Sequence, residues 1–208
     1  AGETDIEFDS GVFSVAGTDK QINIVEVAKS SYTLVMWPPH LGMGLEGIGT
    51  FNPGMGNFPN GCQIAEVEID PETGKVELVN LVIVGDVGTV INPLLLEGQI
   101  HGGITQGVGQ ATLENIVYEG NSGQLLSASF QDYTMPRADD LPLYDVSSHP
   151  VPTTTNPLGV KGAGETGTVG APAAVLNAIV NALSSVGVKD IEMPATSEKV
   201  WQALQNAA

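Results

Sequence analysis

The chain of 208 residues carries 24 acidic and 7 basic side chains, a formal net charge of −17, and 42% of its residues are apolar. This composition indicates a folded protein rather than a disordered one, and the negative charge argues against binding to nucleic acid or to an anionic membrane surface. The single cysteine, Cys62, excludes an internal disulfide and, within this chain, an iron–sulfur cluster or a cysteine-rich zinc site. Because free cysteines are most often buried, we expect Cys62 to be a small buried hydrophobe.

Targeting and metal-ligand signals are weak. No apolar run reaches the roughly 20 residues needed to cross a bilayer, so the sequence predicts no membrane span. Residues 1–5 are acidic and lack the apolar segment of a signal peptide, which favours a cytoplasmic protein, although the missing initiator Met leaves open a mature chain, a processed subunit or part of something longer. His40, His101 and His149 show no metal-ligand spacing, so no direct metal ligand is expected.

The first third of the chain combines short apolar patterns with a long loop. Residues 6–15 and 22–28 carry such patterns, and the second predicts a helix of one to two turns with Asn23 as its cap. Residues 42–61 are dense in Gly, Pro and Asn, which predicts a loop, and loops of this length are usually functional or mobile.

A β-hairpin and a glycine-rich helix are expected next. Residues 65–69 alternate with period two, residues 70–74 form a turn, and residues 76–84 have the pattern of a mostly buried strand. Asn92 and Pro93 are typical of a helix start, and the helix is expected over residues 94–115. It contains several glycines, each of which costs about 0.5–1 kcal/mol relative to Ala. They imply either close packing against another helix or strand, or a bulky ligand lying along the helix.

The C-terminal half is expected to contain a second hairpin, two helices and a short strand. The hairpin would pair residues 116–118 with 125–130, and a polar, proline-broken stretch over 136–157 would follow it. The longer helix, residues 168–185, has its apolar face at Val169, Ala173, Leu176, Ile179 and Leu183. The strand is expected over 186–191 and the last helix over 198–205. The sequence therefore predicts an α+β fold of mixed sheets, β-hairpins and packed helices, with a possible division into residues 1–60 and 61–208.

The glycine-rich segment 159–168 is the strongest candidate for a functional site. Glycines allow backbone to approach a ligand, and the N–H groups that open a helix attract anions. Its G-x-G-x-x-G pattern does not indicate a dinucleotide fold, because residues 151–157 make a poor central strand and too few residues follow for the rest of the sheet. From spacing alone, Glu165 is either a general base or an ordinary acid in the first helical turn, with Thr166 or Thr168 as cap. Lys161 would by default be a solvated surface lysine.

Several segments in this order resemble one large family. They are residues 58–62, 70–74, 86–93, 97–103, 133–142 and 156–165. Together they resemble the C-terminal part of the molybdopterin-binding large subunit of the xanthine dehydrogenase/aldehyde oxidase family, and most closely its carbon monoxide dehydrogenase-like large chains. The resemblance runs from about Phe13 to the C-terminus.

The resemblance implies that the chain is a component of a molybdenum-dependent oxidoreductase. Such enzymes hydroxylate an aldehyde, an N-heterocycle or a similar small substrate, possibly carbon monoxide, with water as the oxygen source. Matched by motif, Glu165 is the catalytic base, Gln99 contacts the pterin, and Lys161 with the Gly162, Ala163 and Gly164 backbone lies near the molybdenum. The implied cofactor is molybdenum-molybdopterin, in its cytosine dinucleotide or a shorter form.

The same resemblance implies that the chain is incomplete. The family's large subunit is several times longer, so the implied partners are its N-terminal part, an iron–sulfur subunit and a flavin subunit. The isolated chain is therefore expected to bind the cofactor weakly and to show no turnover. The alternative is a non-catalytic assembly module, whose glycines serve only close packing.

Overall fold

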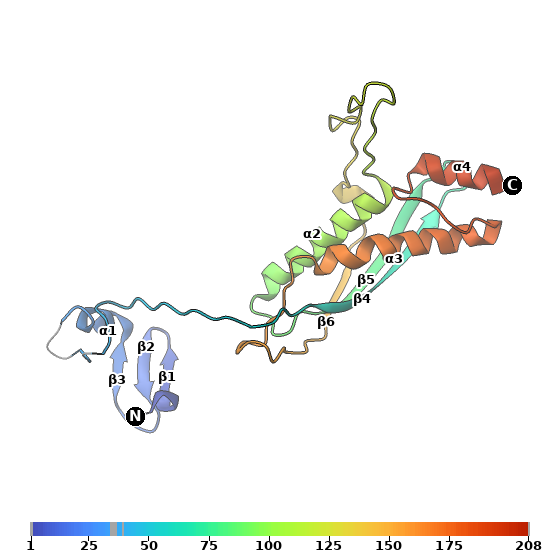
Figure 1. Cartoon of the computed structure of the whole chain (residues 1–208). Helices are drawn as coiled ribbons and strands as arrows, with labels where there is room; N and C mark the ends of the chain where they lie inside the picture. The colour runs from blue at the N-terminus through green and yellow to red at the C-terminus, as the bar shows by residue number, and fades with distance from the viewer. Residues whose placement is uncertain (1, 34–36, 39, 208) are drawn as a thin grey trace. The chain divides into compact units, whose positions relative to one another are not determined.

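The chain forms two compact units, residues 1–52 and 53–208, in a computed structural model that describes residues 2–33, 37–38 and 40–207 (Figure 1). In the first unit β1 (Ile6–Asp9), β2 (Val12–Val15) and β3 (Gln21–Asn23) form an antiparallel sheet in that order, after the 3-10 turn η1 (Glu3–Asp5). Helix α1 (Ile24–Ser30) follows, and the Asn23 side chain accepts a hydrogen bond from the Glu26 N–H at 2.8 Å. The predicted short helix and its cap are confirmed.

The second unit is built on a three-stranded sheet. Strands β4 (Asn60–Ile69) and β5 (Val76–Asp86) form the predicted hairpin, with a bulge at Glu66 and Val67. Strand β6 (Asp145–Ser148) pairs with β5 in parallel. The sequence did not predict β6, because four residues in a polar, proline-broken stretch give no strand pattern until β5 supplies the partner.

Two long helices cover one face of this sheet (Figure 1). Helix α2 (Pro93–Thr112) begins at Asn92, whose Oδ1 accepts a hydrogen bond from the Leu95 N–H at 3.1 Å, as predicted. Helix α3 (Thr166–Leu183) packs against α2 and β4. The core lies between these helices and β5, and includes Leu81, Ile83, Ile104, Val175 and Ile179. The mixed α+β architecture is as expected.

Four of the five glycines of α2 divide into two groups, and a Cβ on the fifth, Gly109, would lie 2.8 Å from Pro136. A Cβ on Gly107 would lie 2.7 Å from the Cβ of Ala171, and one on Gly103 would lie 3.0 Å from the backbone nitrogen of Thr168, so both glycines permit close packing against α3. Gly98 and Gly102 would meet nothing within 4 Å. Close helix packing therefore explains one group and leaves the other facing open space.

Three local predictions are corrected. The buried stripe of α3 is Gly167, Ala171, Val175, Ile179 and Leu183, whereas Val169 and Ala173 are exposed, because Gly167 and Ala171 pack closely against α2. The expected strand at 186–191 is absent from the described residues: the 3-10 turn η3 (Ser184–Val186) ends α3, and an irregular segment leads to α4 (Ser197–Ala207). The second hairpin is reduced to one bridge between Tyr118 and Leu125.

Cys62 is exposed, contrary to expectation. In β4, Gln63, Ala65 and Val67 are partly buried and face the helices, so Cys62 and Ile64 lie on the opposite, open face. Its apolar neighbours in the sequence therefore gave a misleading signal.

Contrary to the sequence prediction, the segment Thr166–Val186 is long and apolar enough to cross a membrane by length and composition alone, with a hydropathy of 1.5. In the structure this segment comprises α3 and the turn after it, and one face of α3 packs against α2 and β4. A core helix passes the same test, so length and composition are weak evidence for a membrane span.

Candidate functional site

The glycine-rich loop is anchored where it begins. The carbonyl of Gly159 accepts hydrogen bonds from the N–H groups of Thr89 at 3.0 Å and Thr153 at 3.1 Å. The Asn156 side chain binds both backbone groups of Val160, donating to its carbonyl at 2.9 Å and accepting from its N–H at 3.1 Å. These hydrogen bonds therefore fix the backbone at the beginning of the loop.

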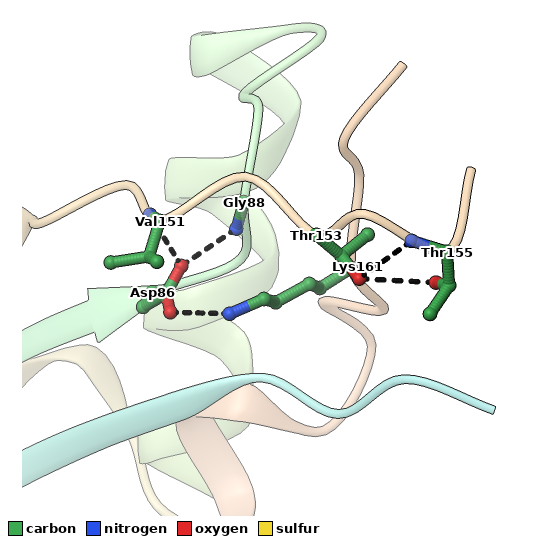
Figure 2. Close-up of polar contacts among 6 residues, drawn as sticks. All are labelled: Asp86, Gly88, Val151, Thr153, Thr155 and Lys161. Carbon is green, nitrogen blue, oxygen red and sulfur yellow. Dashed lines mark hydrogen bonds and ion pairs between the residues drawn. The ribbon is translucent and has the colours of Figure 1, made fainter. Parts of the chain in front are cut away.

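Lys161 is not a solvated surface lysine. Its side chain is 10% exposed and its ammonium contacts Asp86 Oδ2 at 2.5 Å (Figure 2). Asp86 ends β5, and its Oδ1 accepts hydrogen bonds from the N–H groups of Gly88 and Val151. The Lys161 ammonium, and then the Val151 and Gly88 N–H groups, hold the pKa of the Asp86 carboxyl well below its usual range, although burial opposes them.

The following backbone is open. The structure gives the N–H groups of Gly162, Ala163, Gly164 and Glu165 no acceptor among the described residues. A Cβ on Gly162 or Gly164 would meet nothing within 4 Å. These donors precede the N-terminus of α3, an 18-residue helix whose dipole favours negative charge at this end. The arrangement can bind an anionic ligand.

Gln99 reaches this loop from α2. Its side-chain Nε2 donates a hydrogen bond to the carbonyl of Gly164 at 2.7 Å. A cavity of about 430 Å³ lies here, and its lining includes Gln99, Lys161, Ala163 and Gly164. The structure thus brings together four of the residues that the sequence assigned to cofactor binding, and Gly162 lies between two of them in the chain.

Glu165 borders a second cavity. It is the N-cap residue of α3, so the expectation of Thr166 or Thr168 in that position is wrong. Its side chain is exposed and makes no hydrogen bond or ion pair within the part of the chain that the structure describes. The cavity, of about 470 Å³, is also lined by Phe58, Gly61, Gln63 and Val169. A free carboxylate beside a cavity is available to exchange a proton with a ligand.

Two polar residues of the site were missed by sequence reasoning. Gln63 Nε2 donates to the carbonyls of Thr166 at 3.2 Å and Gly167 at 2.9 Å, while its Oε1 and the Thr166 hydroxyl are buried without a partner in the described structure. Gln63 had a signal, since it is a polar residue in the core-facing phase of β4. Asp86 had one too, as a charged residue at the end of a buried strand.

Residues 1–142 match the family model described as "Molybdopterin cofactor-binding domain", and this match covers more than half of the chain. The chain belongs to this molybdopterin cofactor-binding family. The resemblance found in the sequence is therefore confirmed.

Relatives of this member of the family extend the match to α3 and α4. The chain is 40% identical over 205 residues to the nicotine 6-hydroxylase large subunit of Paenarthrobacter nicotinovorans. This match covers 98% of the present chain and 25% of that protein. The structure of CO dehydrogenase from Oligotropha carboxidovorans superposes with a TM-score of 0.85 at 32% identity, over 99% of this chain and 25% of that one. The structure of quinoline 2-oxidoreductase from Pseudomonas putida 86 superposes with a TM-score of 0.82 at 34% identity. This match covers 99% of this chain and 26% of that one. The chain thus spans about a quarter of the length of these relatives.

The open loop fits part of a molybdopterin cofactor. Such a ligand carries a phosphate and a pterin ring whose edges donate and accept hydrogen bonds. The unpaired N–H groups of 162–165 suit an anion, and the Gln99 amide, whose Oε1 makes no hydrogen bond within the described residues, suits a polar ring edge. Across the described residues, no group of three or more His, Cys, Asp or Glu could itself hold a metal ion.

Proposed function

We propose that this chain is a C-terminal portion, residues 1–208, of the large subunit of a molybdenum hydroxylase. Glu165 is the general base, and Gln99 with Lys161, Gly162, Ala163 and Gly164 forms part of the cofactor cradle. The observation that carries the proposal is the junction of α2 and α3, where an unpaired carboxylate adjoins a row of unpaired backbone N–H groups.

In this proposal each part of the site has a distinct role. The bound molybdenum cofactor supplies the two-electron redox chemistry. The N–H groups of 162–164 hold anionic groups of the ligand, and Gln99 fixes the loop while its Oε1 accepts a hydrogen bond from the pterin. The oxygen nucleophile derives from water. The Glu165 carboxylate accepts its proton and holds that proton away from the substrate carbon.

The substrate and the partners belong to the same proposal. The names of the relatives point to an N-heterocycle such as nicotine or quinoline, or to carbon monoxide, and an aldehyde is the further candidate. The rest of the large subunit, an iron–sulfur subunit and a flavin subunit complete the enzyme, and a cytosine dinucleotide form of molybdopterin is the cofactor. The separate chain then has no turnover, because three quarters of the length of its relatives lies outside it.

The decisive experiment compares Glu165→Gln with Glu192→Gln, an exposed control, in the complete enzyme. The molybdenum content of each purified enzyme is measured, and kcat is measured with nicotine, quinoline and carbon monoxide as probe substrates. Glu165→Gln is expected to retain molybdenum and to lose about 10²–10⁴-fold in kcat, the usual contribution of a general base. An unchanged kcat would defeat the assignment of Glu165. A complex purified without molybdenum would instead favour the non-catalytic assembly module.

A further inference from the structure

Asp86 lies where three segments of the second unit meet. It is the last residue of β5 and only 8% exposed, although it is charged. Figure 2 shows its carboxylate between the turn after β5, the segment that follows β6 and the start of the glycine-rich loop. Oδ1 accepts from the N–H groups of Gly88 at 2.8 Å and Val151 at 2.9 Å, and Oδ2 contacts the Lys161 ammonium at 2.5 Å.

Backbone hydrogen bonds reinforce the same junction. The Lys161 N–H donates to the carbonyl of Val87 at 2.9 Å, and the His149 N–H donates to the carbonyl of Gly85 at 2.8 Å. Removing one charge of a nearly buried pair leaves the other uncompensated, so the pair resists separation. Asp86 therefore fixes the position of Lys161 relative to β5.

Lys161 is only four residues before Glu165, and the intervening residues are Gly162, Ala163 and Gly164. Two glycines make this segment flexible unless it is held. It is held in the middle by the bond from Gln99 to Gly164, and at its far end by the first turn of α3, where the Val169 N–H donates to the Glu165 carbonyl at 3.0 Å. At its beginning the ion pair with Asp86 holds the Lys161 side chain, and the bond to the Val87 carbonyl holds its backbone.

We propose that Asp86 is a positioning residue, which acts through Lys161 to fix the backbone that presents the unpaired N–H groups and Glu165. This inference rests on the proposed function for its catalytic meaning. It also assigns the Lys161 ammonium to the loop anchor, because its charge is already matched by Asp86. Anionic groups of the cofactor then bind the backbone N–H groups rather than the Lys161 side chain.

The test is amide hydrogen exchange of the complete protein, read peptide by peptide. The variants are Asp86→Asn, Lys161→Met and Lys161→Arg, and the exposed neighbours Asp190→Asn and Lys189→Met serve as matched controls. Asp86→Asn keeps an oxygen for Gly88 and Val151 but loses the charge that holds Lys161. We expect exchange to be about tenfold or more faster at the hydrogen-bonded amides of residues 149, 151 and 159–161 in Asp86→Asn and Lys161→Met, with α4 unaffected.

Lys161→Arg keeps the charge and is expected to retain loop protection to within about threefold of the parent. Unchanged exchange of the loop in Lys161→Met overturns the proposal, and so does an acceleration spread evenly over β4, α2 and α3, which would indicate a general structural role. If Asp86→Asn does not fold, the contrast between Lys161→Met and Lys161→Arg decides.

Turnover separates this proposal from the proposed function. In the complete enzyme, Asp86→Asn is expected to lower kcat about tenfold or more at an unchanged molybdenum content, because a misplaced catalytic group loses proximity. A loosened loop with an unchanged kcat overturns the positioning role while leaving Glu165 as the base. If Glu165→Gln retains full kcat, the proposed function fails, whereas the exchange results still decide whether Asp86 anchors the loop.

Discussion

The side-chain amide of Gln99, on α2, donates a hydrogen bond of 2.7 Å to the carbonyl oxygen of Gly164, 65 residues later in the chain. This bond joins the glycine-rich helix to the glycine-rich loop at the edge of a cavity of about 430 Å³. The Gln99 Oε1 makes no hydrogen bond among the described residues, so it remains available as an acceptor for a ligand. One residue can thus hold the loop and contact the cofactor.

Replacing Gln99 by Ala should weaken cofactor retention. The change removes the bond to Gly164 and the proposed acceptor for the pterin, and each hydrogen bond contributes about 0.5–1.5 kcal/mol. We expect a loss of about tenfold in affinity, measured as molybdenum retained by the complete enzyme after extended dialysis. Gln110→Ala, an exposed glutamine on the same helix, is the control. Equal retention in the two variants would contradict a role for Gln99.

The two groups of glycines in α2 predict opposite effects of the same substitution. Gly107→Ala places a methyl group 2.7 Å from the Cβ of Ala171 and 2.9 Å from Cδ of Pro172, so α2 and α3 must move apart, at a cost of about 1–3 kcal/mol. Gly102→Ala meets nothing within 4 Å and should stabilise the helix by about 0.5–1 kcal/mol. Urea unfolding followed by far-UV circular dichroism of the chain measures both, and changes of equal sign would refute this division.

Local sequence signals predicted the elements whose ends are marked by cap or turn residues. Asn23, and Asn92 with Pro93, specified two helix starts, and the turn at 70–74 specified a hairpin. Strand β6 depends on a partner some 60 residues earlier in the sequence, so no local pattern could reveal it. The exposure of Cys62 and Val169 likewise follows from which face the helices cover, which only the assembled unit decides.

The candidate site, like the fold, was predicted only in part from the sequence. Resemblance and glycine chemistry selected Gln99 and the loop 161–165, and the structure brings them together. The Asp86–Lys161 pair was missed, since residues 75 positions apart give no local signal of contact. A charged residue ending a buried strand needs a partner, which is the physical argument that could have singled out Asp86.

Asp86 should make the free energy of unfolding of the chain depend more strongly on pH in acid. Lys161, Val151 and Gly88 hold the pKa of its carboxyl below the unfolded value of about 3.9, so its contribution is complete above that pH and is lost as the pH falls towards the folded pKa. Asp86→Asn should therefore be less stable than the parent at pH 7, and the difference should narrow below about pH 4. Urea midpoints between about pH 2 and 7 measure this. A difference that stays constant with pH, or one equal to that of Asp190→Asn, would contradict it.

Gly74 at the tip of the β4–β5 hairpin should be essential for docking α4. Its φ of 70° already favours glycine, and a Cβ there would contact the carbonyl of Ser197 and lie 2.8 Å from the Cβ of Trp201. Gly123 has nearly the same φ, 69°, but a Cβ would meet nothing within 4 Å. The pair therefore separates backbone strain from collision with the helix.

Gly123→Ala should cost about 1–2 kcal/mol, the strain of a left-handed residue. Gly74→Ala carries the same strain and must also displace the first turn of α4, whose Val200 is fully buried. We expect α4 to detach, with a red shift of the fluorescence of Trp201, which is 42% exposed in the folded chain. Measuring emission in a Trp37→Phe background isolates this signal, because the chain has only two tryptophans. Unfolding free energies that fall equally in the two variants would mean that α4 adapts to the added methyl group.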